Sequence, residues 1–211
     1  MTTVGFRTVA ADVEHDIEVK RSLFRCTLRR VADEDAARTV IAQVRRAHWD
    51  ARHHCSAYVL GPAGALQRSH DDGEPAGTAG APMLAALHGA ELTDVVAVVT
   101  RWFGGVLLGT GGLARAYRAA VTGAIESAGV LVRRPVTLLA VAADHAHAGG
   151  LEHAVRAADP AAVRAVDYTA DGVRLALAVP PERVDALRTL VAEQTAGTGS
   201  LAETGSDFAD A

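Results

Sequence analysis

The run VVAVVT at Val95–Thr100 is the feature that most constrains the fold of this chain. It is continuous, mostly β-branched and free of charged residues. A strand with that pattern is buried on both faces, because neither of its two alternating sets of side chains is charged. Two glycine-rich stretches lie on either side of it, DDGEPAGTAGAP at 71–82 and GGVLLGTGG at 104–112. The sequence therefore predicts a buried strand between two loops of unusual composition.

Local patterns predict the other elements of an N-terminal domain, which we expect over residues 1–134. Apolar and polar side chains alternate over 22–31, which is typical of a half-buried strand. A second strand is expected at 55–60, followed by turn-forming glycine and proline. Asp33 suits a helix N-cap, because its carboxylate can accept a backbone N–H. Two further helices are expected, one with Pro82 in its first turn and Gly89 at its end, and one that ends at Gly129.

A smaller second domain is expected over residues 135–208, beginning at Pro135. Asp171-Gly172 is a strong hairpin signal between two of its strands. The order strand, helix, strand, strand, helix, strand fits a ferredoxin-like layer of two helices on an antiparallel sheet. The fold class is therefore α+β. The expected ranges are 137–143, 145–157, 161–168, 173–179, 181–194 and 200–204.

The amino-acid composition is that of a soluble globular chain. Hydrophobic residues make up 49% and charged residues 22% of the 211 positions, which excludes a disordered tail protein. No apolar run approaches the roughly 18 residues of a membrane span. Acidic side chains from Asp12 to Asp16 stand where a signal peptide would be apolar. We therefore expect a cytoplasmic protein with no membrane partner. Two cysteines, Cys26 and Cys55, are too few for a disulfide framework.

The net charge of −4 hides an asymmetry along the chain. Residues 1–136 contain 16 Lys and Arg against 14 Asp and Glu, whereas residues 137–211 contain 5 against 11. Binding of nucleic acid would therefore depend on a local basic patch. One such patch is a set of arginines on the first predicted strand and at the end of the following helix, which could follow a phosphate backbone or simply be solvated. These arginines are Arg21, Arg25, Arg29, Arg45 and Arg46.

Asp71, Asp72 and Glu74, just after His70, form an acidic cluster in the first glycine-rich stretch. Three carboxylates within four positions repel one another, so each needs a partner or solvent. They could bind a hard metal ion or act as a general base. The alternative, which we favour, is an acidic turn that caps backbone N–H groups and pairs with arginines. We expect no metal and no cofactor, and a polar network in which Arg101 and Arg115 hold the two glycine-rich loops together.

Two further clusters allow both a chemical and a structural interpretation. Glycines before a helix leave backbone N–H groups open to an anion, or they allow tight packing. No Lys-Ser/Thr follows them, so they are not a P-loop. His53 and His54 beside Cys55 suggest thiol catalysis or zinc, but adjacent strand residues point to opposite faces, so at most two converge. The glycines concerned are Gly104, Gly105, Gly109, Gly111 and Gly112.

At these motifs the chain resembles the YigZ/IMPACT family. Three segments carry the resemblance: AHWDARHHCSAYVLG at 47–61, RSHDDGEPAGTAGAPML at 68–84 and TRWFGGVLLGTGGLARAY at 100–117. The resemblance implies a two-layer α/β N-terminal domain like those of ribosomal proteins and translation factors. A weaker resemblance over 137–208 implies a domain similar to the last domain of elongation factor G. The chain departs from the family pattern at His70, Trp102 and Leu107, where the family usually has Ser or Asn, Tyr, and Lys.

The resemblance also implies a role in translation. Eukaryotic members regulate translation under stress by binding a ribosome-associated activator of a kinase, but that partner is not expected for a chain with the second domain. The implied function is non-catalytic, cytoplasmic binding of RNA, the ribosome or a translation factor. Two alternatives stay open: a hydrolase centred on the DDGEP loop with His53 and His54, and a module that binds peptides. The oligomeric state is not predicted.

Overall fold

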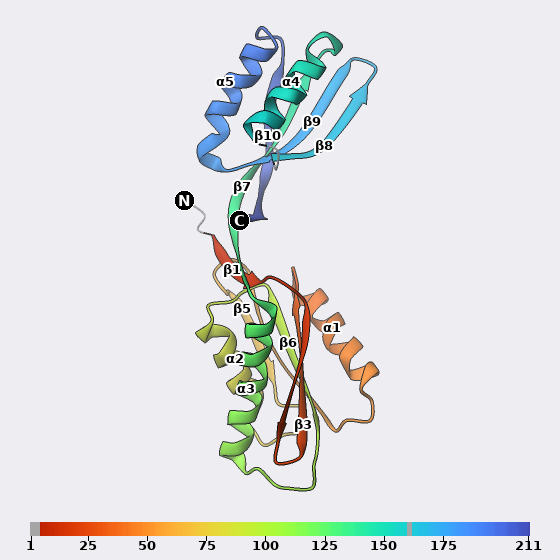
Figure 1. Cartoon of the computed structure of the whole chain (residues 1–211), viewed down its shortest axis with the longest axis vertical. Coiled ribbons are helices and arrows are strands. Elements are labelled where there is room, and N and C mark those ends of the chain that lie inside the picture. The colour runs from red at the N-terminus through yellow and green to blue at the C-terminus, as the bar shows by residue number, and fades with distance from the viewer. Residues whose placement is uncertain (1–4, 160–161) are drawn as a thin grey trace. The chain divides into compact units, whose positions relative to one another are not determined.

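A computed structural model describes residues 5–159 and 162–211 of the chain. The chain divides into two compact units, each with its own sheet and helices (Figure 1). The N-terminal unit is Phe6–Val132, and the C-terminal unit contains Gly5 and Arg133–Ala211. The α+β class predicted from the sequence is confirmed, because each unit combines helices with an antiparallel sheet. No helix formed by the described residues has the length and hydropathy to cross a membrane.

The N-terminal unit is built on a sheet of strand order β2-β3-β6-β4-β5, in which all neighbours are antiparallel. β6 (Val95–Trp102) lies between β3 and β4 and is buried along nearly all its length, so the prediction for VVAVVT is confirmed. The other strands of this sheet are β2 (Val13–Val19), β3 (Ser22–Arg30), β4 (His53–Leu60) and β5 (Leu66–His70), whereas β1 (Phe6–Val9) lies outside it.

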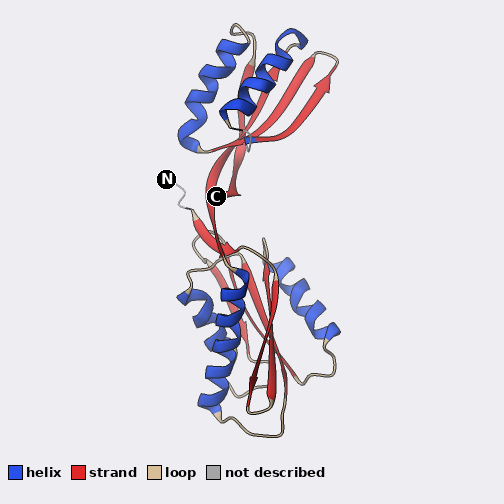
Figure 2. Cartoon of the chain, viewed as in Figure 1, coloured by secondary structure: helices blue, strands red, loops and turns tan. Residues whose placement is uncertain are grey.

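Helices cover both faces of this sheet (Figure 2). Side chains of α2 (Gly80–Gly89) and α3 (Thr110–Ala128) share a core with one set of β6 side chains, including Val99. α1 (Glu34–Ala47) shares a second core with the opposite set, including Val98. This unit therefore has three layers where two were expected. The reason is that β6 presents apolar side chains to both faces, so both faces must be covered.

Local signals set the helix ends of the N-terminal unit. The Asp33 carboxylate accepts the Ala36 N–H at 2.8 Å and so caps α1 as expected. α3 begins at Thr110, directly after Gly109, whose φ is 72°. The second glycine-rich loop is therefore shorter than its sequence suggests. Gly111 and Gly112 belong to the first turn of α3.

The C-terminal unit has the predicted βαββαβ order and a sheet of strand order β10-β7-β9-β8. Its neighbouring strands are antiparallel, and both helices share a core with the sheet, as in ferredoxin-like domains. Pro135 lies inside β7, and the expected start of β8 at 161 is outside the described residues. The elements are β7 (Val130–Ala143), α4 (His145–Ala158), β8 (Val163–Thr169), β9 (Gly172–Val179), a 3₁₀ turn (Pro181–Arg183), α5 (Val184–Gln194) and β10 (Ser200–Asp210).

Candidate functional site

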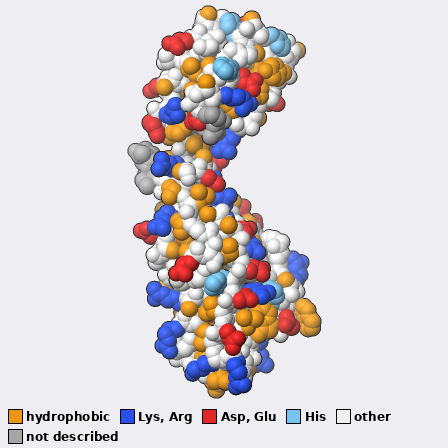
Figure 3. Space-filling model, viewed as in Figure 1, with side chains coloured by type: hydrophobic (Ala, Val, Ile, Leu, Met, Phe, Trp, Pro, Cys, Tyr) orange, Lys and Arg blue, Asp and Glu red, His pale blue; other side chains and the backbone are white. Residues whose placement is uncertain are grey.

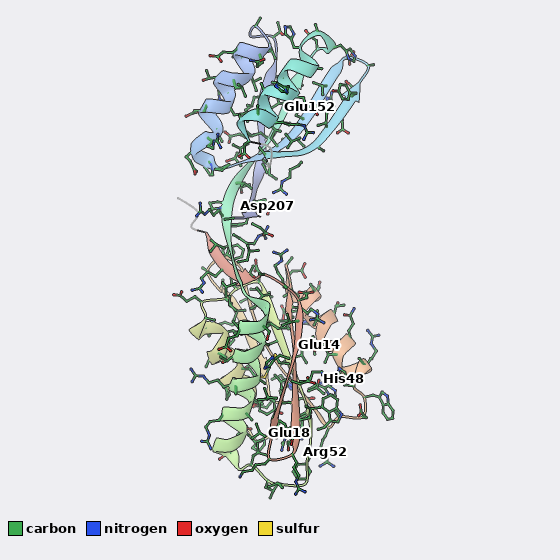
Figure 4. All side chains as sticks on the ribbon, in the orientation of Figure 1. Glu14, Glu18, His48, Arg52, Glu152 and Asp207 are labelled. Atoms are coloured by element: carbon green, nitrogen blue, oxygen red, sulfur yellow. The ribbon has the colours of Figure 1, made fainter. Side chains whose placement is uncertain are left out.

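The acidic cluster, the second glycine-rich loop and the His53-His54 pair lie at one end of the N-terminal sheet. His53, at the start of β4, is paired with Arg101 of β6, and Leu23 of β3 is paired with Trp102. The loops that precede β3 and β4 therefore meet the loop that follows β6. We call residues 20–21, 48–54, 71–79 and 103–109 the loop end. Figure 4 shows Arg52 at this end, near the bottom of the view.

Asp71 holds the start of α2. Its carboxylate accepts the backbone N–H groups of Gly77 at 2.8 Å, Ala79 at 3.0 Å and Gly80 at 2.8 Å. Burial opposes ionisation of this carboxyl, but the three N–H donors outweigh burial and hold the pKa of Asp71 below its usual value. Asp71 is therefore an ionised capping group whose lone pairs are used within the protein.

Asp72 ties the acidic loop to α1 and β4. One carboxylate oxygen accepts from Arg45 at 2.7 Å, and the other accepts the backbone N–H of His54 at 2.7 Å. Its carbonyl oxygen lies 2.9 Å from Nδ1 of His53. The His54 ring also approaches Asp72, with its Nδ1 3.7 Å from Oδ2, while its Nε2 lies 3.0 Å from the carbonyl oxygen of His48. These contacts give Asp72 a bracing role between three segments.

Glu74 forms a buried ion pair with Arg101. Its Oε1 accepts from Arg101 Nη1 at 2.7 Å and from the Tyr117 hydroxyl at 2.7 Å. Arg101 is only 6% exposed, and its guanidinium lies 5.4 Å from the centre of the Phe24 ring. Burial raises the pKa of Tyr117 far above its usual value, so the phenol keeps its proton and donates it. The acidic loop is thereby joined to β6 and α3.

Arg101 takes part in the network predicted from the sequence, whereas the Arg115 side chain makes no hydrogen bond or ion pair with any described residue. Arg115 is exposed on α3, whereas Tyr117, two residues further along, faces the core. Two residues correspond to about 200° around a helix, so the two side chains point to opposite sides. The apolar pattern of α3 placed Tyr117 in the core. The signal that could have identified its role is its hydroxyl, because a buried phenol usually needs a hydrogen-bond partner.

Cys55 has the environment of a structural thiol. Its Sγ donates to the carbonyl oxygen of Asp71 at 2.9 Å, and burial raises its pKa to about 12. A thiol with that pKa is not a nucleophile at neutral pH, because the thiolate is the reactive form. Across residues 5–159 and 162–211, no group of three or more His, Cys, Asp or Glu side chains is arranged to hold a metal ion.

Gly104 allows the loop after β6 to approach the turn before β3. A Cβ at this position would come within 2.0 Å of the Arg21 carbonyl oxygen. The Gly104 N–H donates to the Ser22 hydroxyl at 3.1 Å. Gly105 and Gly109 have φ values of 84° and 72°, which glycine adopts without strain. The geometry thus gives this loop's glycines a packing and turn-forming role.

Most of the arginines expected to contact phosphate are paired with carboxylates. Arg25 donates to both oxygens of Asp16, at 2.8 and 2.7 Å. Arg29 lies 3.7 Å from Asp12 and 3.6 Å from Glu14. Figure 4 shows Glu14 and Glu18 along β2, the strand that carries Glu14 and Asp16, and Asp12 directly precedes this strand in the sequence. Arg45 pairs with Asp72, so only Arg21 and Arg46 of the five make no hydrogen bond or ion pair within the described part of the chain.

Lys20 and Arg21 form the turn between β2 and β3 in an unusual backbone conformation. Val19 pairs with Ser22, so the hairpin loop has only these two residues. Their φ values are 47° and 64°. Positive φ at both positions is what a type I′ hairpin requires, and Asn-Gly is the usual solution. Left-handed backbone costs an ordinary residue about 1–2 kcal/mol. Lys20 and Arg21 therefore occupy the tip of the hairpin in a backbone conformation that is unfavourable for both residues.

Exposed aromatic and apolar side chains accompany the unpaired cations of the loop end. Trp49 is 81% exposed, Phe103 55% and Leu107 82%. Figure 3 shows Lys and Arg side chains close to hydrophobic ones around the lower end of the N-terminal unit. For the residues that the structure describes, no ion pair or hydrogen bond engages the side chains of Lys20, Arg21, Arg46, Arg52 or Arg115.

Comparison with known proteins finds one matching family model in each unit of this chain. Residues 20–125 match the Impact N-terminal domain, and residues 141–198 match a domain of unknown function (DUF1949). IMPACT family member YvyE of Bacillus subtilis (strain 168) is 43% identical over 152 residues, which cover 72% of this chain and 70% of that protein. IMPACT family member YigZ of Escherichia coli (strain K12) is 37% identical over 194 residues, covering 91% and 94%.

A solved structure is also similar to this chain over nearly its full length. It is described as the crystal structure of an hypothetical protein, and it superposes with a TM-score of 0.66 at 35% sequence identity. The match covers 94% of this chain and 96% of the other. The identity and coverage of these relatives, together with the matched N-terminal domain, show that the chain belongs to the IMPACT family.

Proposed function

We propose that this protein is a non-catalytic, cytoplasmic component of translation that binds RNA, free or in the ribosome, through its loop end. The observation that carries the proposal is the set of unpaired, exposed cations beside exposed aromatic rings. Unpaired cations can neutralise phosphates and release the counterions condensed on RNA. The link to translation rests on the family resemblance.

The pairing of the arginines decides which of them contribute to binding. Arg25 would have to leave Asp16 before it could contact a phosphate, so the gain would be offset by the lost ion pair. Lys20 and Arg21 have no such partner among the residues that the structure describes. Their strained turn adds support, because strain at a surface position often accompanies a functional requirement. In this proposal the functional requirement is positive charge at the hairpin tip, where it can contact RNA phosphates.

The arrangement of the acidic loop gives less support to a hydrolase. Asp71, Asp72 and Glu74 each accept hydrogen bonds from protein donors. A general base needs a carboxylate or imidazole that can reach a substrate proton. The thiol of Cys55 is protonated at neutral pH. The loop end therefore favours binding over bond-breaking chemistry.

Charge reversal at Arg21 and Arg52 tests the proposed function. The double variant Arg21→Glu/Arg52→Glu should bind a labelled hairpin RNA with single-stranded tails at least tenfold more weakly than the parent, and should co-sediment less with ribosomes. Each lost phosphate contact should reduce the slope of log affinity against log salt by about 0.7 to 0.9. Arg7→Glu is the matched control, because Arg7 is already paired with Glu91. If the parent protein binds neither RNA nor ribosomes at low salt, the proposal is contradicted.

A further inference from the structure

Trp49 is an indole displayed on the surface of the loop end. It is 81% exposed, while Trp102, the other tryptophan, is half-buried and donates its Nε1–H to Asp50 at 2.8 Å. An aromatic side chain that stays exposed to water contributes no burial free energy to the stability of the fold. In the part of the chain that the structure describes, no aromatic or cation–π contact involves Trp49. The indole face is therefore available to a partner outside this chain.

The backbone on both sides of Trp49 is held in place. His48 donates its N–H to the carbonyl oxygen of Val44 at 3.0 Å, and its ring packs against Trp102 with ring centres 5.3 Å apart. Asp50 accepts from Trp102, and the Ala51 N–H donates to His48. The indole thus projects from a fixed tip. Binding through a fixed tip loses less conformational entropy than binding through a mobile loop.

The surroundings of Trp49 favour a polyanion that carries flat apolar groups. Arg46 and Arg52 are near it in the sequence and have no partner within residues 5–159 and 162–211. Asp50, the adjacent carboxylate, is engaged by Trp102. Phe103 offers a second exposed ring on the neighbouring loop, 5.6 Å from the Arg101 guanidinium. Rings between phosphate-binding cations are the surface that single-stranded nucleic acid uses, since each base has a face that can stack.

We propose that the loop end takes single-stranded RNA and that an unpaired base stacks on Trp49. This inference rests on the proposed function and narrows it to one class of RNA. In a duplex the bases are stacked on one another, so an exposed indole has no base face to contact. Stacking on an aromatic side chain contributes about 1–3 kcal/mol per base and tolerates any base. Recognition at Trp49 is therefore selective for unpaired RNA and indifferent to its sequence.

Two tryptophans in the full chain make the test direct. The intrinsic fluorescence of the full-length protein is titrated with oligouridine and with an adenosine–uridine duplex of the same length. We expect quenching and tighter binding with oligouridine. Trp49→Leu should weaken oligouridine binding about five- to hundredfold, as the stacking energy implies, and leave the salt slope unchanged. Trp49→Phe should retain most of the affinity. Tyr168→Leu is the matched control, since it also replaces an exposed ring (63%) by leucine but lies in the C-terminal unit, outside the loop end, and its change should be within twofold.

The outcomes separate this inference from the proposed function. Equal affinity of the parent for the two RNAs, or unchanged oligouridine binding by Trp49→Leu, would overturn the stacking role while RNA binding itself stands. Loss of binding in Arg21→Glu/Arg52→Glu together with loss in Trp49→Leu supports both. Binding of anionic lipid vesicles or an acidic peptide through Trp49, with no binding of either RNA, would overturn both.

Discussion

The carboxylates and the cations of the loop end share the same loops but differ in their partners. Asp71, Asp72 and Glu74 each accept at least two hydrogen bonds from the protein. Lys20 and Arg52 form none with the described residues. A hydrolytic site would show the opposite division, with a carboxylate free to take a proton. The difference indicates that the acids hold the loops in place and that the cations are available to an external anion.

Removal of the buried carboxylate should have the largest effect on stability. Glu74→Ala leaves the Arg101 guanidinium buried without its partner and the Tyr117 hydroxyl without an acceptor. Breaking such a buried pair costs about 3–5 kcal/mol. Urea unfolding at pH 7, followed by hydrogen exchange of the N-terminal unit, measures this loss. Glu91→Ala, which breaks an exposed pair with Arg7, should cost at most about 1 kcal/mol. Equal losses in the two variants would show that Glu74 does not brace the loop.

The architecture could be predicted from the sequence wherever a local pattern agreed with its long-range partners. The uncharged run at β6 is one example and is present in the structure. The Asp171-Gly172 signal located the β8–β9 hairpin, although Thr169 pairs with Gly172 and the two loop residues are Ala170 and Asp171. A polar network joining the acidic cluster to Arg101 and Arg115 was also expected, and the structure pairs Glu74 with Arg101. Tyr117 was assigned to the core instead of to this pair. Its hydroxyl meets Glu74 only because the acidic loop folds back onto α3, and no local pattern encodes that contact.

The β2–β3 hairpin shows why the cation pairing was not foreseen. Its turn is Lys20-Arg21, and neither residue signals a type I′ turn. Without the turn, the VEHDIEV strand and its carboxylates had no assigned neighbour. Asp16 is directly opposite Arg25 in the register of the hairpin, so the missed turn was also a missed ion pair. The turn therefore lacks the residues that a type I′ conformation favours, and it lies where the unpaired cations are. Functional sites often depart from local sequence preferences in this way.

Replacement of the strained turn sharpens the comparison, because stability and binding should move in opposite directions. Lys20→Asn/Arg21→Gly supplies the residues that prefer positive φ at both positions. The free energy of unfolding should rise by about 1–2 kcal/mol, since the left-handed strain is relieved. RNA affinity should fall several-fold, because two unpaired charges are lost. Urea unfolding and RNA titration of the same preparation measure both. Unchanged RNA binding in a stabilised variant would mean that the hairpin tip serves another purpose.

The smallest expected effect on stability comes from freeing a paired cation. Asp16→Asn removes the carboxylate that Arg25 contacts at 2.7 Å, and an exposed pair of this kind contributes about 0.2–1 kcal/mol. The hydrogen bond from Arg25 holds the pKa of Asp16 below its usual value. The contribution of the pair is therefore fully present above the unfolded pKa of about 3.9, and it is lost as pH falls through the lower folded pKa. Parent and variant should thus differ in stability at pH 7 and converge in acid.

Asp16→Asn should also leave the Arg25 guanidinium without its carboxylate partner. If pairing is what separates the two groups of charges, Asp16→Asn should bind RNA more tightly at pH 7 and steepen the salt dependence by about 0.7 to 0.9. Asp12→Asn is the matched control, because Asp12 lies 3.7 Å from Arg29, which keeps Glu14 at 3.6 Å. An increase in RNA affinity that occurs only in Asp16→Asn would show that the bidentate ion pair with Asp16 keeps Arg25 from contacting RNA. An equal gain in both variants would instead assign the effect to net charge, and pairing would not explain which arginines bind.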